Sequence, residues 1–100
     1  AYIGKARALF ADGDSDTAVD CLNRAADIDP ADWRALYELG VYYLGAGRLP
    51  EALERLLTAA DRCDDVAEIH LAIAEVYDTV GDAKMARRHR TRARNLRKGK

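Results

Sequence analysis

Apolar side chains recur along the whole chain at the spacing of an amphipathic helix. In the middle third, Leu36, Leu39 and Tyr43 fall at positions i, i+3 and i+7, which form one stripe on a helix. A second stripe of the same kind begins at Ala52, and equivalent stripes precede and follow this segment. The pattern predicts an all-α chain with six helices at about residues 2–11, 15–28, 33–45, 50–62, 66–79 and 83–97.

Glycine, proline and aspartate mark the expected ends of these helices. Gly47 can adopt the left-handed conformation that closes a helix. Pro50 suits the first turn of the next helix, because a backbone N–H at that position would have no hydrogen-bond partner within the helix. Pro30 is expected to stop the second helix. Residues that precede later helices are candidate N-caps or first-turn acids: Asp14 or Ser15, Asp32, Asp64 or Asp65, and Asp82.

Small residues recur with a period of 34 residues. The columns of this repeat are Gly13, Gly47 and Gly81; Ala18, Ala52 and Ala86; Ala25, Ala59 and Ala93; and Ala6, Gly40 and Ala74. A period of this length is typical of stacked helix–turn–helix units. Side chains no larger than alanine let two helix axes approach to about 8–10 Å, so two of the columns indicate the packing seams between helices, namely Ala6, Gly40 and Ala74, and Ala18, Ala52 and Ala86.

The repeated positions resemble those of the tetratricopeptide repeat family, whose unit is a 34-residue helix–turn–helix. The matching residues are Leu9, Gly13, Ala18, Leu22, Ala25 and Pro30 in the first unit; Leu39-Gly40, Tyr43, Gly47, Ala52, Leu56 and Ala59 in the second; and Tyr77, Gly81, Ala86 and Ala93 in the third. The resemblance implies an α-solenoid of three repeats at about residues 1–32, 33–66 and 67–100. These repeats are expected to form a single domain of six antiparallel helices in a right-handed superhelix.

The resemblance also implies a function, because the first helices of such repeats line a groove that binds a peptide or helix of a partner protein. Transferring the family's groove columns to this chain gives candidate partner-binding residues at Arg7, Phe10, Arg34, Tyr37, Val41, Leu44, Arg48, Leu71, Glu75 and Asp78, with Ile3, Glu38, Glu68 and Asp82 beside them. The charges predict a guest whose acidic end lies over the arginines of the first two units and whose basic end lies over the carboxylates of the third. The alternative is a groove that is merely structural.

Charge divides the chain into two unequal parts. Residues 1–83 hold 17 acidic and 7 basic side chains, a balance of −10, whereas residues 84–100 hold 9 basic and no acidic ones. This basic last helix suggests a second candidate function, the binding of an anionic partner such as nucleic acid or an acidic protein surface, through Arg87, Arg88, Arg90 and Arg94. Nucleic acid is disfavoured because no aromatic residue is interleaved for base stacking.

The same helix has the features of a terminal cap. Arg90 occupies the column of Leu22 and Leu56, and Arg94 that of Ala26 and Ala60. An unpaired buried guanidinium costs several kcal/mol, so an ordinary fourth repeat is not expected to pack there.

Nothing in the sequence points to catalysis, a cofactor or a metal. His70 and His89 have no nucleophile or metal ligand at helical spacing; His70 is expected in the core and His89 in solvent. Cys21 and Cys63 form no CxxC motif, which favours free thiols and a reducing, cytoplasmic compartment. No apolar run approaches the roughly 20 residues of a membrane span.

The chain begins with Ala1, already inside the first helix of its repeat, and is therefore expected to be a piece of a longer protein. In a stacked array this helix would contact a preceding repeat. We expect the resulting apolar face near Ile3 and Ala6 to favour weak self-association.

Overall fold

The computed structural model describes the backbone of residues 2–98 and the side chains of residues 5–98, so expectations that involve Ala1 or the side chain of Ile3 lie outside the described residues. The helices are α1 (Tyr2–Ala11), α2 (Ser15–Ile28), α3 (Trp33–Gly45), α4 (Leu49–Arg62), α5 (Ala67–Val80) and α6 (Ala83–Lys98). The part of the chain that the structure describes contains no strand. All six predicted helices are confirmed, with ends that differ by at most one residue.

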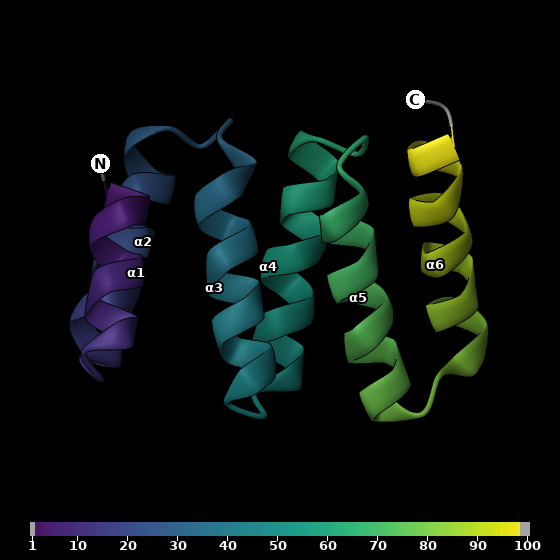
Figure 1. Cartoon of the computed structure of the whole chain (residues 1–100), viewed down its shortest axis with the longest axis horizontal. Coiled ribbons are helices and arrows are strands. Elements are labelled where there is room, and N and C mark those ends of the chain that lie inside the picture. The colour runs from purple at the N-terminus through teal and green to yellow at the C-terminus, as the bar shows by residue number, and fades with distance from the viewer. Residues whose placement is uncertain (1, 99–100) are drawn as a thin grey trace.

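The helices form three hairpins, α1–α2, α3–α4 and α5–α6, which stand in a row from one end of the molecule to the other (Figure 1). Consecutive hairpins meet through α2 against α3 and α4 against α5, and the first helices also contact one another, α1 with α3 and α3 with α5. This arrangement confirms the predicted solenoid of helical hairpins.

The turn inside each hairpin has the same geometry. Gly13, Gly47 and Gly81 have φ values of 86°, 79° and 89°, a region that side chains with a Cβ rarely adopt. The residue after each glycine donates its N–H to a carbonyl five residues earlier, and all three of these hydrogen bonds measure 2.8 Å. This pattern is the Schellman closure of a helix C-terminus, and it explains why glycine recurs every 34 residues.

Aspartate caps three of the helices as the sequence predicts. Side chains of Asp14, Asp32 and Asp82 accept hydrogen bonds from backbone N–H groups in the first turns of α2, α3 and α6. The prediction for the fifth helix is wrong: its N-cap is Val66, and neither Asp64 nor Asp65 caps it. α5 begins one residue later than predicted, so both aspartates lie before the cap position.

The columns of Gly40 and of Ala52 lie in the seams between paired helices. A Cβ added to Gly40 would lie 2.5 Å from Cγ of Leu56, so α3 and α4 touch at this point. Ala18, Ala52 and Ala86 are all fully buried, each on the second helix of its hairpin. The packing role predicted for these columns is confirmed.

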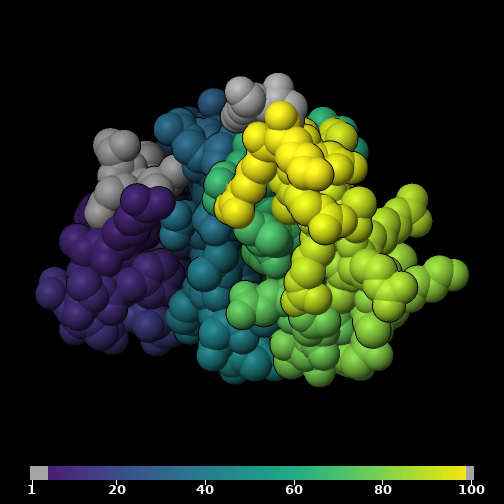
Figure 2. Space-filling model, turned by 45° about the vertical axis from the view of Figure 1, so that its right-hand side comes forward, coloured from purple at the N-terminus to yellow at the C-terminus, as the bar shows by residue number. Residues whose placement is uncertain are grey.

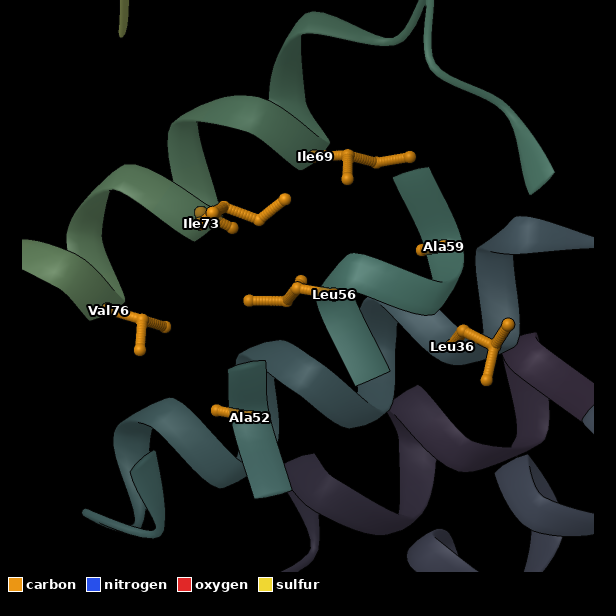
Figure 3. Close-up of a cluster of buried hydrophobic side chains, with 8 residues drawn as sticks. Leu36, Ala52, Leu56, Ala59, Ile69, Ile73 and Val76 are labelled. Carbon is orange, nitrogen blue, oxygen red and sulfur yellow. The ribbon is translucent and has the colours of Figure 1, made fainter. Parts of the chain in front are cut away.

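Two apolar clusters form the core. One joins the first two hairpins around Leu22 and Leu39, and the other joins the second and third. Figure 3 shows the second cluster, in which Ile73 of α5 points toward Leu56 of α4. Ala6 is also fully buried in the first cluster, where its small side chain lies in the α1–α2 seam as its column predicts, so Ala6 itself adds nothing to the apolar surface expected near it.

Candidate partner-binding groove

A hollow of about 420 Å³ opens between α3 and α5, and we call it the α3–α5 groove. Its lining consists of Tyr37, Val41, Leu44, Glu68, Leu71, Ala72, Glu75 and Arg90. Five of the ten residues predicted for partner binding meet here. They meet because residues 34 positions apart occupy equivalent places on α3 and α5, so Tyr37 corresponds to Leu71 and Val41 to Glu75.

Tyr37 lies half-buried in this groove, with its ring edge-on to Trp33 at a centroid distance of 6.1 Å. Burial raises the pKa of the Tyr37 hydroxyl, and the nearby carboxylates of Glu38, Glu68 and Glu75 raise it further, against a smaller opposing effect of Arg7. The side chain is therefore an uncharged phenol at neutral pH. It combines an apolar ring with a hydrogen-bonding tip, which suits contact with a partner.

Glu68 and Glu75 give the groove its charge. Both residues are exposed, and they lie seven positions apart on α5, two helical turns along the same face. Among the side chains of residues 5–98, no lysine or arginine lies within ion-pair distance of either carboxylate. The apolar floor of the groove is thus bordered by two uncompensated negative charges.

The groove continues toward α1 in a second, smaller hollow of about 180 Å³. Phe10, Glu38, Val41 and Tyr42 line it, and the rings of Phe10 and Tyr42 stack with a centroid distance of 5.1 Å. Val41 lines both hollows and is 40% exposed. Val41 therefore connects the hollow that contains Phe10 with the groove that contains the other predicted apolar residues.

Arg7 and Arg34 are already paired with carboxylates of the chain itself. Arg7 Nη2 donates to Glu38 Oε1 over 2.6 Å, and this hydrogen bond raises the pKa of Arg7. Arg34 Nη2 donates to Asp32 Oδ2 over 2.8 Å, and the hydrogen bonds from Arg34 lower the pKa of Asp32. These two guanidinium groups are exposed, but each has a partner within its own molecule.

Arg48 lies in the turn between α3 and α4 and does not line the groove. Its Nε is 3.0 Å from Glu51 Oε2, and its guanidinium lies 5.9 Å from the centroid of the Tyr43 ring. All three arginines expected to meet the acidic end of a guest therefore have intramolecular partners.

A third hollow, of about 460 Å³, lies between α5 and α6, and we call it the terminal hollow. Its lining consists of Leu71, Asp78, Ala83, Arg87, Arg90, Thr91 and Arg94. Asp78 forms an ion pair with Arg90 here, so this predicted groove residue faces α6. Three of the four arginines proposed for an anionic partner meet in this hollow. Arg88 is exposed but is not part of its lining.

His89 corrects one expectation from the sequence. The side chain is half-buried, and its ring stacks on both His70 and Tyr77, with centroid distances of 5.4 and 5.8 Å. The side chain faces α5, where its Nδ1 lies 3.2 Å from Nδ1 of His70. Burial lowers the pKa of His89, and His70 and then Arg88 lower it further. The expected core position of His70 is confirmed.

Sequence reasoning missed four residues that line these hollows: Tyr42, Ala72, Ala83 and Thr91. Tyr42 and Ala72 each follow a predicted groove residue, Val41 or Leu71, and lie on the flank of the predicted stripe. Arg90 is predicted from the sequence only for an anionic partner, yet it lines the groove as well as the terminal hollow. A helical-wheel search widened by one position on each flank would have included Tyr42 and Ala72.

The described residues contain neither a metal-binding cluster nor a membrane-spanning helix. Within that part of the chain, no group of three or more histidine, cysteine or carboxylate side chains is arranged to hold a metal ion. None of its helices has the length and apolar character needed to cross a membrane.

Comparison with known proteins identifies the family. The profile of the tetratricopeptide repeat matches residues 3–68. The BBSome complex member BBS4 of Bos taurus is 30% identical over 71 residues, and the mouse protein of the same name is 31% identical; the match spans 14% of either protein.

Solved structures of MamA resemble the fold. MamA from Desulfovibrio magneticus RS-1 is 25% identical, with a TM-score of 0.88 over 99% of this chain and 56% of that one. A further crystal structure of MamA, 21% identical, shows the fold alone, with a TM-score of 0.91 over 98% of this chain and 57% of that one. Tetratricopeptide repeats bind protein partners and are generally non-enzymatic interaction modules. Because the family profile covers about two thirds of the residues, this chain belongs to the tetratricopeptide repeat family.

Proposed function

We propose that this domain binds a segment of a partner protein in the α3–α5 groove and catalyses no reaction itself. The observation that carries the proposal is the partly exposed apolar floor formed by Tyr37, Val41 and Leu71 between uncompensated carboxylates. Large aromatic and aliphatic side chains in such a hollow can anchor a partner, because covering them removes apolar surface from water at little entropic cost.

The comparisons support a role in assembly. BBS4, which is similar to this chain, is named as a member of a protein complex. We propose that residues 1–100 act as one interaction domain, since each hairpin contacts the next. Cys21 and Cys63 are free thiols, which fits a reducing compartment such as the cytoplasm.

A peptide-display selection tests the proposal and requires no identified partner. Peptides selected on the immobilised domain are synthesised with a fluorescent label, and their affinities are measured by anisotropy for the wild type and for the variants Tyr37→Ala and Val41→Ala. We expect these variants to bind about tenfold more weakly, because truncating an anchor residue typically costs more than 1 kcal/mol.

Leu57→Ala is the matched control. Leu57 is 41% exposed, almost the same as Val41 at 40%, but it lies on α4 and is not part of the groove lining. This variant should bind the selected peptides with wild-type affinity. The proposal fails if no peptide is selected, or if Tyr37→Ala and Val41→Ala bind as tightly as Leu57→Ala.

A further inference from the structure

One stripe of α5 separates the two larger hollows. Glu68, Leu71, Glu75 and Asp78 follow at i, i+3, i+7 and i+10, so they lie along one face of the helix. Leu71 and Arg90 line both the α3–α5 groove and the terminal hollow, which makes the two hollows neighbouring parts of one surface. In Figure 2 the green surface of α5 is visible between the blue-green of α3 and the yellow of α6.

The two sides of this stripe carry opposite charge. On the α3 side, Glu68 and Glu75 have no cationic partner among the described side chains, and their charge contributes to the raised pKa of Tyr37. This side of the surface favours a cation. A lysine or arginine of a guest would find carboxylates there, and its aliphatic stem would cover the apolar floor.

On the α6 side, three guanidinium groups and one carboxylate line the terminal hollow. Asp78 pairs with Arg90, whereas Arg87 and Arg94 have no carboxylate within ion-pair distance in the part of the chain whose side chains are described. Both lie on one face of α6, seven residues apart, and both are exposed. This side of the surface favours an anion.

We propose that the guest has a fixed order of charges: a basic side chain over Glu68 and Glu75, an apolar side chain over Leu71, and a carboxylate over Arg87 and Arg94. The inference rests on the proposed binding of a partner segment and specifies its chemistry. It reverses the position of the guest's acidic end relative to the sequence-based expectation. That end moves from Arg7, Arg34 and Arg48, which have internal partners, to α6.

The same charges argue against nucleic acid as the occupant. A phosphate backbone that approached Arg87 and Arg94 would also approach the carboxylates of the α5 stripe. Like charges at close range disfavour such a complex, whereas a guest with both signs of charge satisfies both sides.

Three synthetic peptides of equal length test the charge order. They share one apolar centre and differ at their ends: one carries a basic and an acidic end, one carries two basic ends, and one carries two acidic ends. We expect the peptide with one end of each sign to bind about tenfold more tightly than either of the others, because only it pairs charges on both sides of α5.

Charge reversal in the protein locates the acidic end. Arg87→Glu together with Arg94→Glu should shift the preference to the peptide with two basic ends. The control, Lys84→Glu together with Arg88→Glu, changes the net charge of α6 equally but alters exposed residues outside the lining of both hollows, so it should keep the wild-type preference. Circular dichroism of each variant verifies that the helices are intact.

Each remaining outcome overturns the inference. It is wrong if the three peptides bind equally, or if both double variants shift the preference alike. It is also wrong if a single-stranded oligonucleotide binds more tightly than any peptide with the steep salt dependence of phosphate contacts. If display-selected peptides bind through Tyr37 while this set does not, the charge order fails and the proposed function stands. If no peptide binds at all, the proposed function itself fails.

Discussion

Helices α4 and α6 occupy the same place in successive repeats, yet they differ on the face that points to the next repeat. Leu56 of α4 is fully buried between α3 and α5, whereas Arg90 of α6, in the same column, has a side chain 52% exposed and paired with Asp78. Residues that face the partner helix do not differ: Ala52 and Ala86 are both fully buried. Small side chains therefore fix the hairpin, whereas the column of Leu56 and Arg90 is apolar on α4, where the next hairpin packs, and charged on α6.

The largest predicted effect on stability comes from replacing Leu56 of α4 with arginine, the residue type that occupies the same column in α6. Leu56→Arg removes a fully buried side chain and introduces a charge without a partner, so we expect a loss of at least about 4 kcal/mol in the free energy of unfolding. Urea denaturation followed by circular dichroism measures this loss. A variant that shows no helical circular-dichroism signal even without urea is unfolded, which also agrees with the prediction.

The reverse exchange is the control. Arg90→Leu breaks one surface ion pair, and the free energy of unfolding should change by less than about 1 kcal/mol. Equal effects of the two exchanges would show that positions 56 and 90 do not differ in the way described.

A medium effect is predicted at the α3–α4 seam. Gly40→Ala places a Cβ 2.5 Å from Cγ of Leu56, and the required movement should cost about 1–3 kcal/mol. Gly45→Ala, on the same helix with nothing within 4 Å of the added Cβ, should be neutral or stabilising by about 0.5 kcal/mol. Thermal unfolding of both variants makes the comparison, and similar melting temperatures would contradict the close approach at Gly40.

The smallest predicted effect is a pH dependence of stability that arises where α6 packs on α5. His89 stacks on His70 and Tyr77, and its pKa is lowered in the folded state by burial, by His70 and by Arg88. The unfolded chain therefore binds a proton more readily, so stability should fall as the pH drops below about 6.5, the ordinary pKa of histidine. His89→Gln should weaken this dependence. Unfolding measured between about pH 7.5 and pH 5 tests it, and an unchanged slope would refute this role of His89.

The sequence predicts the helices accurately because their ends depend on local chemistry. Gly47 and Pro50 specify a turn regardless of what packs against it, and the 34-residue period carries that information to the other two hairpins. The burial of the small residues in the columns of Gly40 and Ala52 was predictable for the same reason. It follows from helical spacing, which is a property of the chain alone.

The charge arrangement at the candidate site was not predictable in this way. Arg7 pairs with Glu38 across 31 residues, and Asp78 pairs with Arg90 across 12. These partners depend on how one helix is placed against another, which periodicity does not reveal. The stacking of His89 on His70 was unpredictable for the same reason, since the high polarity of α6 indicates a solvent-facing residue.

Trp33, the chain's single tryptophan, meets the Tyr37 ring edge-on at the end of the α3–α5 groove. A guest that covers Tyr37 changes the polarity around this indole, and indole emission shifts with polarity. The unlabelled protein thus carries its own optical reporter of occupancy, which allows titrations without an attached dye.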